Sequence, residues 1–303
     1  MATTPDPATP DFDAIPDLAA PGSDAARTPD ADPNPSFPEP HVINPTSDHT
    51  HTIIILHGKG SNAEILVKAL LEAKSSDEPN KSIFECFPNI RWVFPNARRI
   101  STTPDTNQGV YEWFPMAGYQ NPLEEEESQK PEMRNTIHYI NGLLTAELAT
   151  VNGDTTKIIL GGVCQGLAAA LALFLALGHT FGGFIGISGW LPRAKQFSAS
   201  TSHLKSPPIN YFIDYFELEL EHPTEEAYLS HRNARSKVPI FLGHGQDDGH
   251  IHVCFGHEAA DLLGELGYNV TIKTYVGGEE DGHWLKLPEE MDAIKRFIES
   301  ITK

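Results

Sequence analysis

Cysteine, basic side chains and long apolar runs are all scarce in this sequence. Its 303 residues contain three widely spaced cysteines, Cys86, Cys164 and Cys254, with no C-x-x-C pair. That pattern favours a reducing compartment and disfavours a structural zinc site. Nothing approaches the run of about 18 apolar residues that spans a membrane. Lys and Arg number 22 against 41 Asp and Glu. The formal charge of −19 argues against a nucleic-acid partner, because phosphate binding needs a basic face.

The first 48 residues differ in composition from the rest of the chain. Eleven of the 24 prolines lie before residue 46, and only one Lys or Arg precedes Lys59. Such a segment offers too little apolar surface to offset its ordering entropy, so we predict a disordered acidic tail at residues 1–48 and one domain at residues 49–303. The tail has neither the cationic and apolar regions of a secretory signal nor the Arg-rich character of a transit peptide. We therefore expect a cytoplasmic protein.

From residue 52 onward, apolar strand-like runs alternate with helix-like segments. Several runs are apolar throughout, as strands buried on both faces of a parallel sheet are. The alternation predicts an α/β fold with a mostly parallel, doubly wound sheet flanked by helices. The predicted strands are Thr52–Leu56, Arg91–Phe94, Lys157–Leu160, Phe184–Ile187, Pro239–Leu242 and Val270–Tyr275. The predicted helices are Asn62–Lys74, Pro131–Glu147, Leu167–Leu177, His257–Leu266 and Pro288–Ile301.

Two long segments interrupt the alternation, around residues 96–130 and 192–237. In α/β sheets, insertions after the carboxyl ends of strands commonly shape the ligand site. An equally simple interpretation is a solvated loop with one extra surface helix. The second segment contains an aromatic stretch at residues 211–216. This stretch would either cover a groove or form the contact of a homodimer.

The sequence GGVCQG at residues 161–166 joins a predicted strand to a helix rich in Ala and Leu. Gly162 and Gly166 flank Cys164 in a G-x-C-x-G pattern, which is that of a nucleophile elbow with sulfur in place of oxygen. The turn is so sharp that only residues without a bulky side chain fit on either side. The alternative is a buried structural thiol, the commonest state of a lone intracellular cysteine.

A nucleophile at such a turn needs a base and an orienting acid, which follow it along the chain in the order acid, histidine. His283 lies after the last predicted strand and before the last predicted helix, where the base is expected. Asp247 and Asp248 both follow the strand that ends at Leu242. Because adjacent side chains point in different directions, position alone does not choose between them.

Donors for a developing oxyanion are predicted from HGKG at residues 57–60, directly after the first strand. The backbone N–H of Lys59, paired with that of Gln165 just after the nucleophile, would hold the oxyanion. By itself the motif is also that of a plain turn between a strand and a helix.

Six motifs in a fixed order resemble the acyl-protein thioesterase and carboxylesterase/phospholipase branch of the α/β-hydrolase superfamily. The similarity covers about residues 50–302. The matching sequences are HGKG at 57–60, RWVFP at 91–95, GGVCQG at 161–166, SGWLP at 188–192, LGHG at 242–245 with Asp248, and GHW at 282–284. The resemblance implies an α/β-hydrolase fold, selects Asp248 as the acid, and assigns the oxyanion N–H groups to Lys59 and Gln165.

The resemblance also implies where a substrate binds. Trp190 and Leu191 would line an acyl-binding groove, and we add Trp113 and Trp284 as candidate substrate-binding residues.

Two positions depart from the family pattern. The family nucleophile is serine, and here it is Cys164; the family sequence W-F-D is here W-F-P at residues 113–115, which predicts a reshaped loop. A free thiol has a pKa of about 8.5 and is already partly thiolate at neutral pH. Its attack on a thioester is a nearly thermoneutral exchange, whereas its attack on an oxygen ester is uphill. Hydrolysis of the resulting acyl-enzyme then needs His283 to activate water.

We therefore favour a hydrolase of carboxylic esters or thioesters with a Cys164–His283–Asp248 triad and a covalent acyl-enzyme. Its substrate would be a small-molecule ester or thioester, or an acylated protein. A second hypothesis is acyl transfer, a rearrangement in small-molecule biosynthesis, or lactone opening as in dienelactone hydrolases, which also use a cysteine at the elbow. A third is a binding protein that kept the fold and lost the chemistry, which the otherwise complete triad argues against.

We expect neither a cofactor nor a metal. The sequence has no Gly-rich phosphate loop. Its four neighbouring histidines, His244, His250, His252 and His257, are better explained by one motif together with surface residues than by a metal site.

Overall fold

The computed structural model describes residues 36–100, 109–116, 118–119, 121–124, 126–202, 210–220, 234 and 236–303. All of these residues belong to the unit that spans Ser36–Lys303. Residues 1–35, most of the predicted tail, lie outside them. Within the described ranges, no helix has the length and apolar character needed to cross a membrane.

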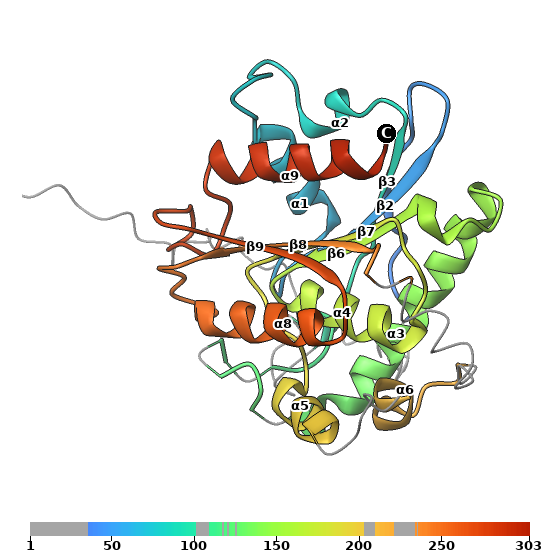
Figure 1. The fold of residues 1–303 in the computed structure, drawn as a ribbon, viewed down its shortest axis with the longest axis vertical. Coiled ribbons are helices and arrows are strands. Elements are labelled where there is room, and N and C mark those ends of the chain that lie inside the picture. Colours follow the sequence, from blue (N-terminus) through green and yellow to red (C-terminus); the bar gives the residue numbers. More distant parts are fainter. Residues whose placement is uncertain are drawn as a thin grey trace, which may run out of the picture. The chain divides into compact units, whose positions relative to one another are not determined.

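A seven-stranded sheet in the order β1-β3-β2-β6-β7-β8-β9 runs through the centre of this unit (Figure 1). Neighbouring strands are parallel, except that β1 is antiparallel to β3. The strands are β1 (His41–Ile43), β2 (His51–Leu56), β3 (Ile90–Phe94), β6 (Ile158–Val163), β7 (Gly183–Ile187), β8 (Pro239–Gly245) and β9 (Asn269–Tyr275). A separate hairpin joins β4 (Arg98–Ile100) to β5 (Val110–Glu112). The predicted fold class and all six predicted strands are confirmed.

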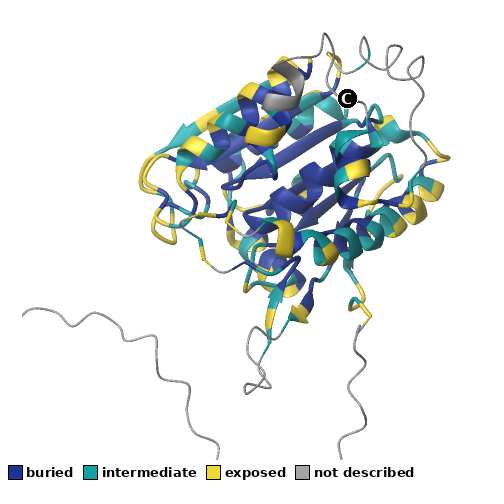
Figure 2. Ribbon diagram, turned by 90° about the horizontal axis from the view of Figure 1, so that it is seen from below, coloured by how far each residue is buried: buried dark blue, intermediate teal, exposed yellow. Residues whose placement is uncertain are grey.

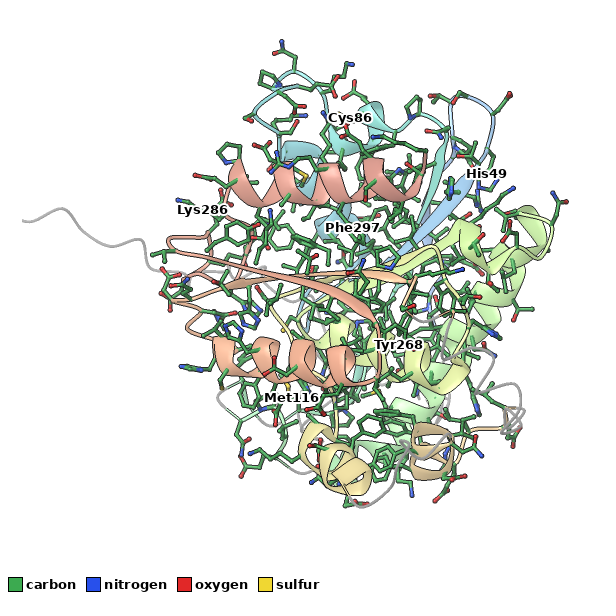
Figure 3. The ribbon with its side chains drawn as sticks, viewed as in Figure 1. His49, Cys86, Met116, Tyr268, Lys286 and Phe297 are labelled. Carbon is green, nitrogen blue, oxygen red and sulfur yellow. The ribbon has the colours of Figure 1, made fainter. Side chains whose placement is uncertain are left out.

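Helices cover both faces of the sheet. In Figure 1, α1, α2 and α9 lie above it and α3, α4 and α8 below, with α5 and α6 beyond the lower layer. The helices are α1 (Ala63–Glu72), α2 (Ile83–Cys86), α3 (Glu126–Thr150), α4 (Gln165–Leu177), α5 (Ala194–Ser202), α6 (Tyr211–Phe216), α8 (Val253–Glu265) and α9 (Glu289–Ile301). The five predicted helices are all present. Buried residues concentrate in the sheet and on the helix surfaces that face it (Figure 2), and side chains fill the space between the layers (Figure 3).

The packing of helix α4 explains why its sequence is apolar on every face. Eleven of its 13 residues are buried, because it packs against β6 on one side and against α3 and α6 on the other. Its many alanines leave room for this close packing. The N-terminus of α4, which carries the residues after Cys164, is therefore held firmly in the core.

The aromatic stretch at residues 211–216 forms α6, where Phe212, Ile213 and Phe216 are buried. The helix contacts α3 and α4. These three side chains therefore extend the core instead of covering a groove. Dimerisation stays a prediction.

The prediction of a disordered tail is wrong for residues 36–48. Strand β1 lies in this segment and pairs with β3, with Val42 opposite Val93. Phe37 stacks on Tyr139 with a ring-centroid distance of 4.1 Å. The proline-rich average composition concealed a short apolar strand and one aromatic side chain, which together supply enough burial to order the segment.

Glu290, in the first turn of α9, is a buried carboxylate with 2% of its surface exposed. It lies against β8, so that a Cβ atom on Gly243 would come within 1.9 Å of Glu290 Oε1. Its Oε2 accepts a 3.0 Å hydrogen bond from the Lys286 backbone N–H. Burial raises the pKa of Glu290 to about 7, although that hydrogen bond lowers it. The carboxyl therefore keeps its proton in the folded protein at pH values where the unfolded chain has lost it.

We predict that this proton makes the protein less stable as pH rises from about 5 to about 8. The folded state then binds more protons than the unfolded state, so the free energy of unfolding falls with pH, by up to about 3 kcal/mol. In Glu290→Gln this contribution is absent. Denaturant unfolding at both pH values measures the difference, with Glu289→Gln, an exposed neighbour, as the matched control. The same pH dependence in wild type and Glu290→Gln would contradict the prediction.

Candidate active site

Cys164 occupies a sharp turn between β6 and α4. Its backbone angles are φ 52° and ψ −120°, a sparsely populated region for a residue with a side chain. A Cβ atom at Gly162 would lie 2.4 Å from the carbonyl carbon of Gly166, and one at Gly166 would lie 2.4 Å from the His57 oxygen. Both flanking glycines are therefore required by close backbone approach. The turn presents the Cys164 side chain to a cavity.

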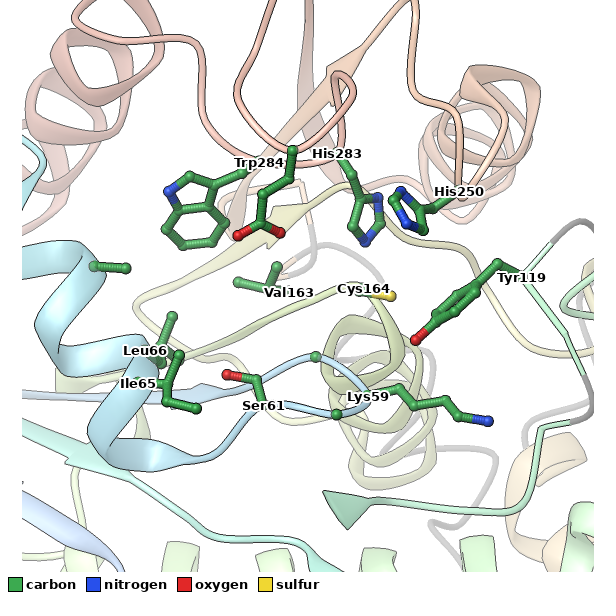
Figure 4. Close-up of a pocket in the computed structure, with 14 residues that line it drawn as sticks. Lys59, Ser61, Ile65, Leu66, Tyr119, Val163, Cys164, His250, His283 and Trp284 are labelled. Atoms are coloured by element: carbon green, nitrogen blue, oxygen red, sulfur yellow. The ribbon is translucent and has the colours of Figure 1, made fainter. Parts of the chain in front are cut away.

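His283 lies on the loop between β9 and α9 and points toward Cys164 (Figure 4). Its Nδ1 is 2.8 Å from Asp248 Oδ2 and 3.0 Å from Oδ1. Burial lowers the pKa of His283, but hydrogen bonds to Asp248 and Cys164 outweigh it and raise the pKa to about 10. With Nδ1–H donated to the carboxylate, Nε2 is left for Cys164.

Asp248 accepts hydrogen bonds on both carboxylate oxygens. Oδ1 accepts from the backbone N–H groups of His250 and Ile251, each at 2.8 Å, and Oδ2 lies 3.2 Å from His244 Nε2. Burial raises the pKa of Asp248, yet the hydrogen bonds from His244 and His283 lower it to well below its usual range. The carboxylate is therefore held ionised beside the imidazole of His283.

Asp247 points elsewhere. Its Oδ2 accepts a 2.8 Å hydrogen bond from the Gly277 backbone N–H and so braces the loop that follows β9. The geometry thus brings Asp248, and not its neighbour, to His283. His244 was not singled out as a partner of Asp248, although it belongs to the LGHG motif that precedes the acid.

The loop after β2 lies directly beside Cys164, because a Cβ atom on Gly58 would sit 3.3 Å from Cys164 Cβ. Burial lowers the pKa of His57 to about 4, so its imidazole is neutral. His57 Nδ1 donates to the Gly58 carbonyl at 2.8 Å, and Nε2 accepts from the Ala97 N–H at 3.1 Å. These bonds hold the backbone of the predicted oxyanion loop in place.

Gln165 follows the elbow and is fully buried. Its Oε1 accepts from the Trp113 N–H at 2.9 Å, and its Nε2 donates to the Phe114 carbonyl at 2.7 Å. The side chain therefore joins the elbow to the W-F-P segment. Trp113 is itself fully buried and donates through Nε1 to the His57 carbonyl at 2.7 Å. Its indole connects two loops of the site.

Lys59 forms a largely buried ion pair with Glu112, with Nζ 3.0 Å from Oε2 and 1% of Glu112 exposed. Lys59 Nζ also donates to the Met116 carbonyl, and the Gly60 N–H donates to the Tyr111 carbonyl at 2.8 Å. Strand β5 thus holds the predicted oxyanion loop through its backbone and through Glu112. Glu112 was missed at the sequence level because nothing near it in the chain indicates a partner 53 residues away.

A cavity of about 360 Å³ lies in front of Cys164 (Figure 4). Its lining combines apolar and polar side chains. The apolar ones are Ile65, Leu66, Ala69, Val163 and Trp284, and the polar ones are Lys59, Ser61, Tyr119, His250, Glu280 and His283.

Of the four candidate substrate-binding residues, Trp284 lines this cavity. Trp113, Trp190 and Leu191 are 0–2% exposed and are not among its lining residues. The structure places these three in the core.

The four neighbouring histidines do not converge on one point. His244 faces Asp248 and the Ile251 carbonyl, and His252 accepts from the Cys254 N–H at the start of α8. In the part of the chain that the structure describes, the one group with the spacing of metal ligands is Asp248, His250 and His283, whose donor atoms all lie within 4.8 Å of one another.

Comparisons with known proteins agree with this architecture. A family model for phospholipases and carboxylesterases matches residues 38–214. The acyl-protein thioesterase 1 of Gibberella zeae is 25% identical over 262 residues, which cover 86% of this chain and 94% of that protein. The acyl-protein thioesterase 1 of Candida albicans is 24% identical over 251 residues, which cover 82% and 92% of the two chains.

Solved structures support the fold. The crystal structure of Zea mays acyl-protein thioesterase 2 matches with a TM-score of 0.61 at 24% identity, and the match covers 88% of this chain and 99% of that one. The chain therefore has the α/β-hydrolase fold and belongs to the phospholipase/carboxylesterase family.

Proposed function

We propose that the protein hydrolyses carboxylic thioesters and esters, with Cys164 as nucleophile, His283 as general base and acid, and Asp248 as the group that orients His283. The observation that carries this proposal is that Asp248 holds Nδ1 of His283 at 2.8 Å while the imidazole points toward Cys164 in the wall of a single cavity (Figure 4). The names of the curated relatives support thioester hydrolysis, since they describe enzymes that act on acylated proteins.

The reaction begins when the Cys164 thiolate attacks the carbonyl carbon of the substrate. Negative charge develops on the carbonyl oxygen, and the backbone N–H groups of Lys59 and Gln165 stabilise it. The tetrahedral species collapses, the bond to the leaving group breaks, and the imidazolium of His283 gives that group its proton. The product of this half-reaction is an acyl thioester on Cys164.

Water completes the cycle. Neutral His283 takes a proton from a water molecule as it attacks the thioester carbonyl. The carboxylic acid leaves, and Cys164 departs as a thiolate beside the reprotonated imidazole. The proton that His283 accepts from water replaces the one that it gave to the leaving group in the first half-reaction.

The cysteine favours thioesters over oxygen esters. Exchange of one thioester for another is nearly thermoneutral, whereas formation of a thioester from an oxygen ester is uphill. The apolar lining residues Ile65, Leu66, Ala69 and Trp284 would take the acyl chain. The substrate class is therefore an acyl thioester, on a protein or on a small molecule.

A time course with an octanoyl thioester tests this function. Intact mass follows the acyl adduct while released thiol is measured in parallel. We expect steady thiol release with a transient adduct in the wild type, neither in Cys164→Ala, and both in Cys254→Ala, which removes an exposed thiol that does not line the cavity. Thiol release by Cys164→Ala at the wild-type rate would contradict the assignment of Cys164 as the nucleophile. A stoichiometric adduct that never turns over would instead favour acyl transfer or a rearrangement.

The two adjacent aspartates provide a second prediction. Asp248→Asn should lower kcat by at least about 100-fold, because an amide favours the wrong tautomer of the base. Asp247→Asn is the matched control, since its carboxylate bonds the Gly277 N–H and not His283. Steady-state kinetics with the same thioester measures both variants. If Asp247→Asn were the more damaging change, the assignment of the acid would be wrong.

The buried ion pair of Lys59 and Glu112 provides a third prediction. We expect Glu112→Gln to lower kcat about tenfold with little change in KM, because loss of one oxyanion donor costs about 100-fold and displacement of the loop costs less. The double variant Lys59→Met/Glu112→Leu should recover part of the loss, since neither partner is then left as an unpaired buried charge. A change in KM alone, or no change, would mean that the pair does not position the Lys59 N–H.

A further inference from the structure

His250 has no part in the hydrolysis proposed above, yet it lies in the same cavity. Its ring is next to that of His283, with a centroid distance of 4.8 Å, and meets the edge of Tyr119 at 5.2 Å. Its backbone N–H donates to Asp248, which fixes the residue beside the catalytic pair. Its Nδ1 is buried and has no hydrogen-bond partner among the described residues. A second imidazole is thus held close to the first with a nitrogen that nothing satisfies.

The arrangement around His283 is one that zinc ligands commonly have. A histidine that binds zinc usually donates its other ring N–H to a carboxylate, which fixes the ring and leaves the second nitrogen for the metal. His283 donates Nδ1–H to Asp248 in this way, and its other side points toward Cys164 (Figure 4). Asp248 already accepts from two backbone N–H groups and two imidazoles. Its carboxylate is therefore suited to the outer shell and not to direct coordination.

Three residues that carry suitable donors line the same part of the cavity: Cys164, His283 and His250 (Figure 4). The two imidazoles are close enough to share an ion, since donor atoms of His250 and His283 lie within 4.8 Å of each other. The Cys164 sulfur, which lines the same cavity, would join them by a side-chain rotation, to reach Zn–N distances of about 2.1 Å and a Zn–S distance of about 2.3 Å. Thiolate and imidazole ligands suit Zn²⁺ and are poor ligands for Mg²⁺ or Ca²⁺.

We propose that Cys164, His283 and His250 form a binding site for Zn²⁺, with water as the fourth ligand, and that bound zinc reversibly blocks the hydrolytic site. Cys164 and His283 together release one proton to solvent as the Zn–S and Zn–N bonds form, and no group is oxidised or reduced. Zinc then occupies the sulfur lone pair and the Nε2 lone pair, so neither attack nor proton transfer can occur. The inhibitory consequence rests on the proposed function, whereas the metal site itself does not.

Zinc binding can be measured without any substrate. Full-length protein is freed of metal with EDTA and titrated with ZnCl₂ in competition with a chromophoric chelator. Co²⁺ is then substituted, because a thiolate ligand gives a charge-transfer absorption band. We expect one Zn²⁺ per chain and a thiolate–cobalt band that disappears in Cys164→Ala. Millimolar Mg²⁺ should not displace the zinc.

Variants of His250 test whether zinc binds at this site or at other histidines and cysteines. His250→Ala and His250→Gln should weaken zinc binding by at least about 100-fold, since loss of even an outer-shell partner costs about 10–100-fold. His252→Ala is the matched control, because His252 contacts the start of α8 and does not line the cavity. Circular dichroism establishes that each variant is folded.

Thioester hydrolysis gives the functional readout. In wild type and His252→Ala, zinc should abolish turnover and EDTA should restore it, while both His250 variants should need at least about 100-fold more zinc. Equal zinc affinity in the wild type and the folded His250 variants, or an unchanged cobalt spectrum in Cys164→Ala, would overturn the site. Stoichiometric zinc binding without any hydrolysis by the metal-free protein would contradict the proposed function and leave the metal site established.

Discussion

The sharp turn at Cys164 is the constraint on which the rest of the site depends. A non-glycine residue at φ 52° costs on the order of 1–3 kcal/mol, and the surrounding packing has to offset that cost. The Cys164 N–H donates to the Ile187 carbonyl at 2.9 Å, Gly166 packs against the end of β2, and α4 is buried behind the turn. The position of the thiol is thus fixed by three strands and a helix.

Polar contacts between distant segments complete the arrangement. Gln165 reaches the W-F-P segment, Glu112 reaches Lys59, and Asp248 reaches both His244 and His283. Each of these polar side chains is buried or nearly so, where an unpaired group would cost about 1–3 kcal/mol. The contacts therefore favour one arrangement of the loops over competing ones, and a single polar substitution is expected to affect more than its own residue.

Local patterns were sufficient for the central sheet, because apolar runs mark buried strands. They also placed His283 and the two adjacent aspartates after strand ends, but the choice of Asp248 came from the family resemblance. Local patterns failed where the role of a residue depends on partners that are distant in the sequence but close in space. Trp113 and Trp190 were expected to face a substrate, yet both are buried in the core. Glu112 gave no local signal, and His250 was set aside as one of four neighbouring histidines, since the partners of both lie on other loops. Strand β1 was concealed by the prolines around it.

Strand β1 also covers an edge of the central sheet. It is three residues long and covers the outer edge of β3, a strand whose other side pairs with β2. An uncovered, hydrophobic parallel strand offers unpaired N–H and C=O groups on which further chains can assemble, and a very short edge strand offers few. Proteolytic cleavage between β1 and β2 would release this cover. The segment that composition alone assigns to a tail therefore leaves the sheet with a shorter open edge, on which other chains have fewer groups to pair with.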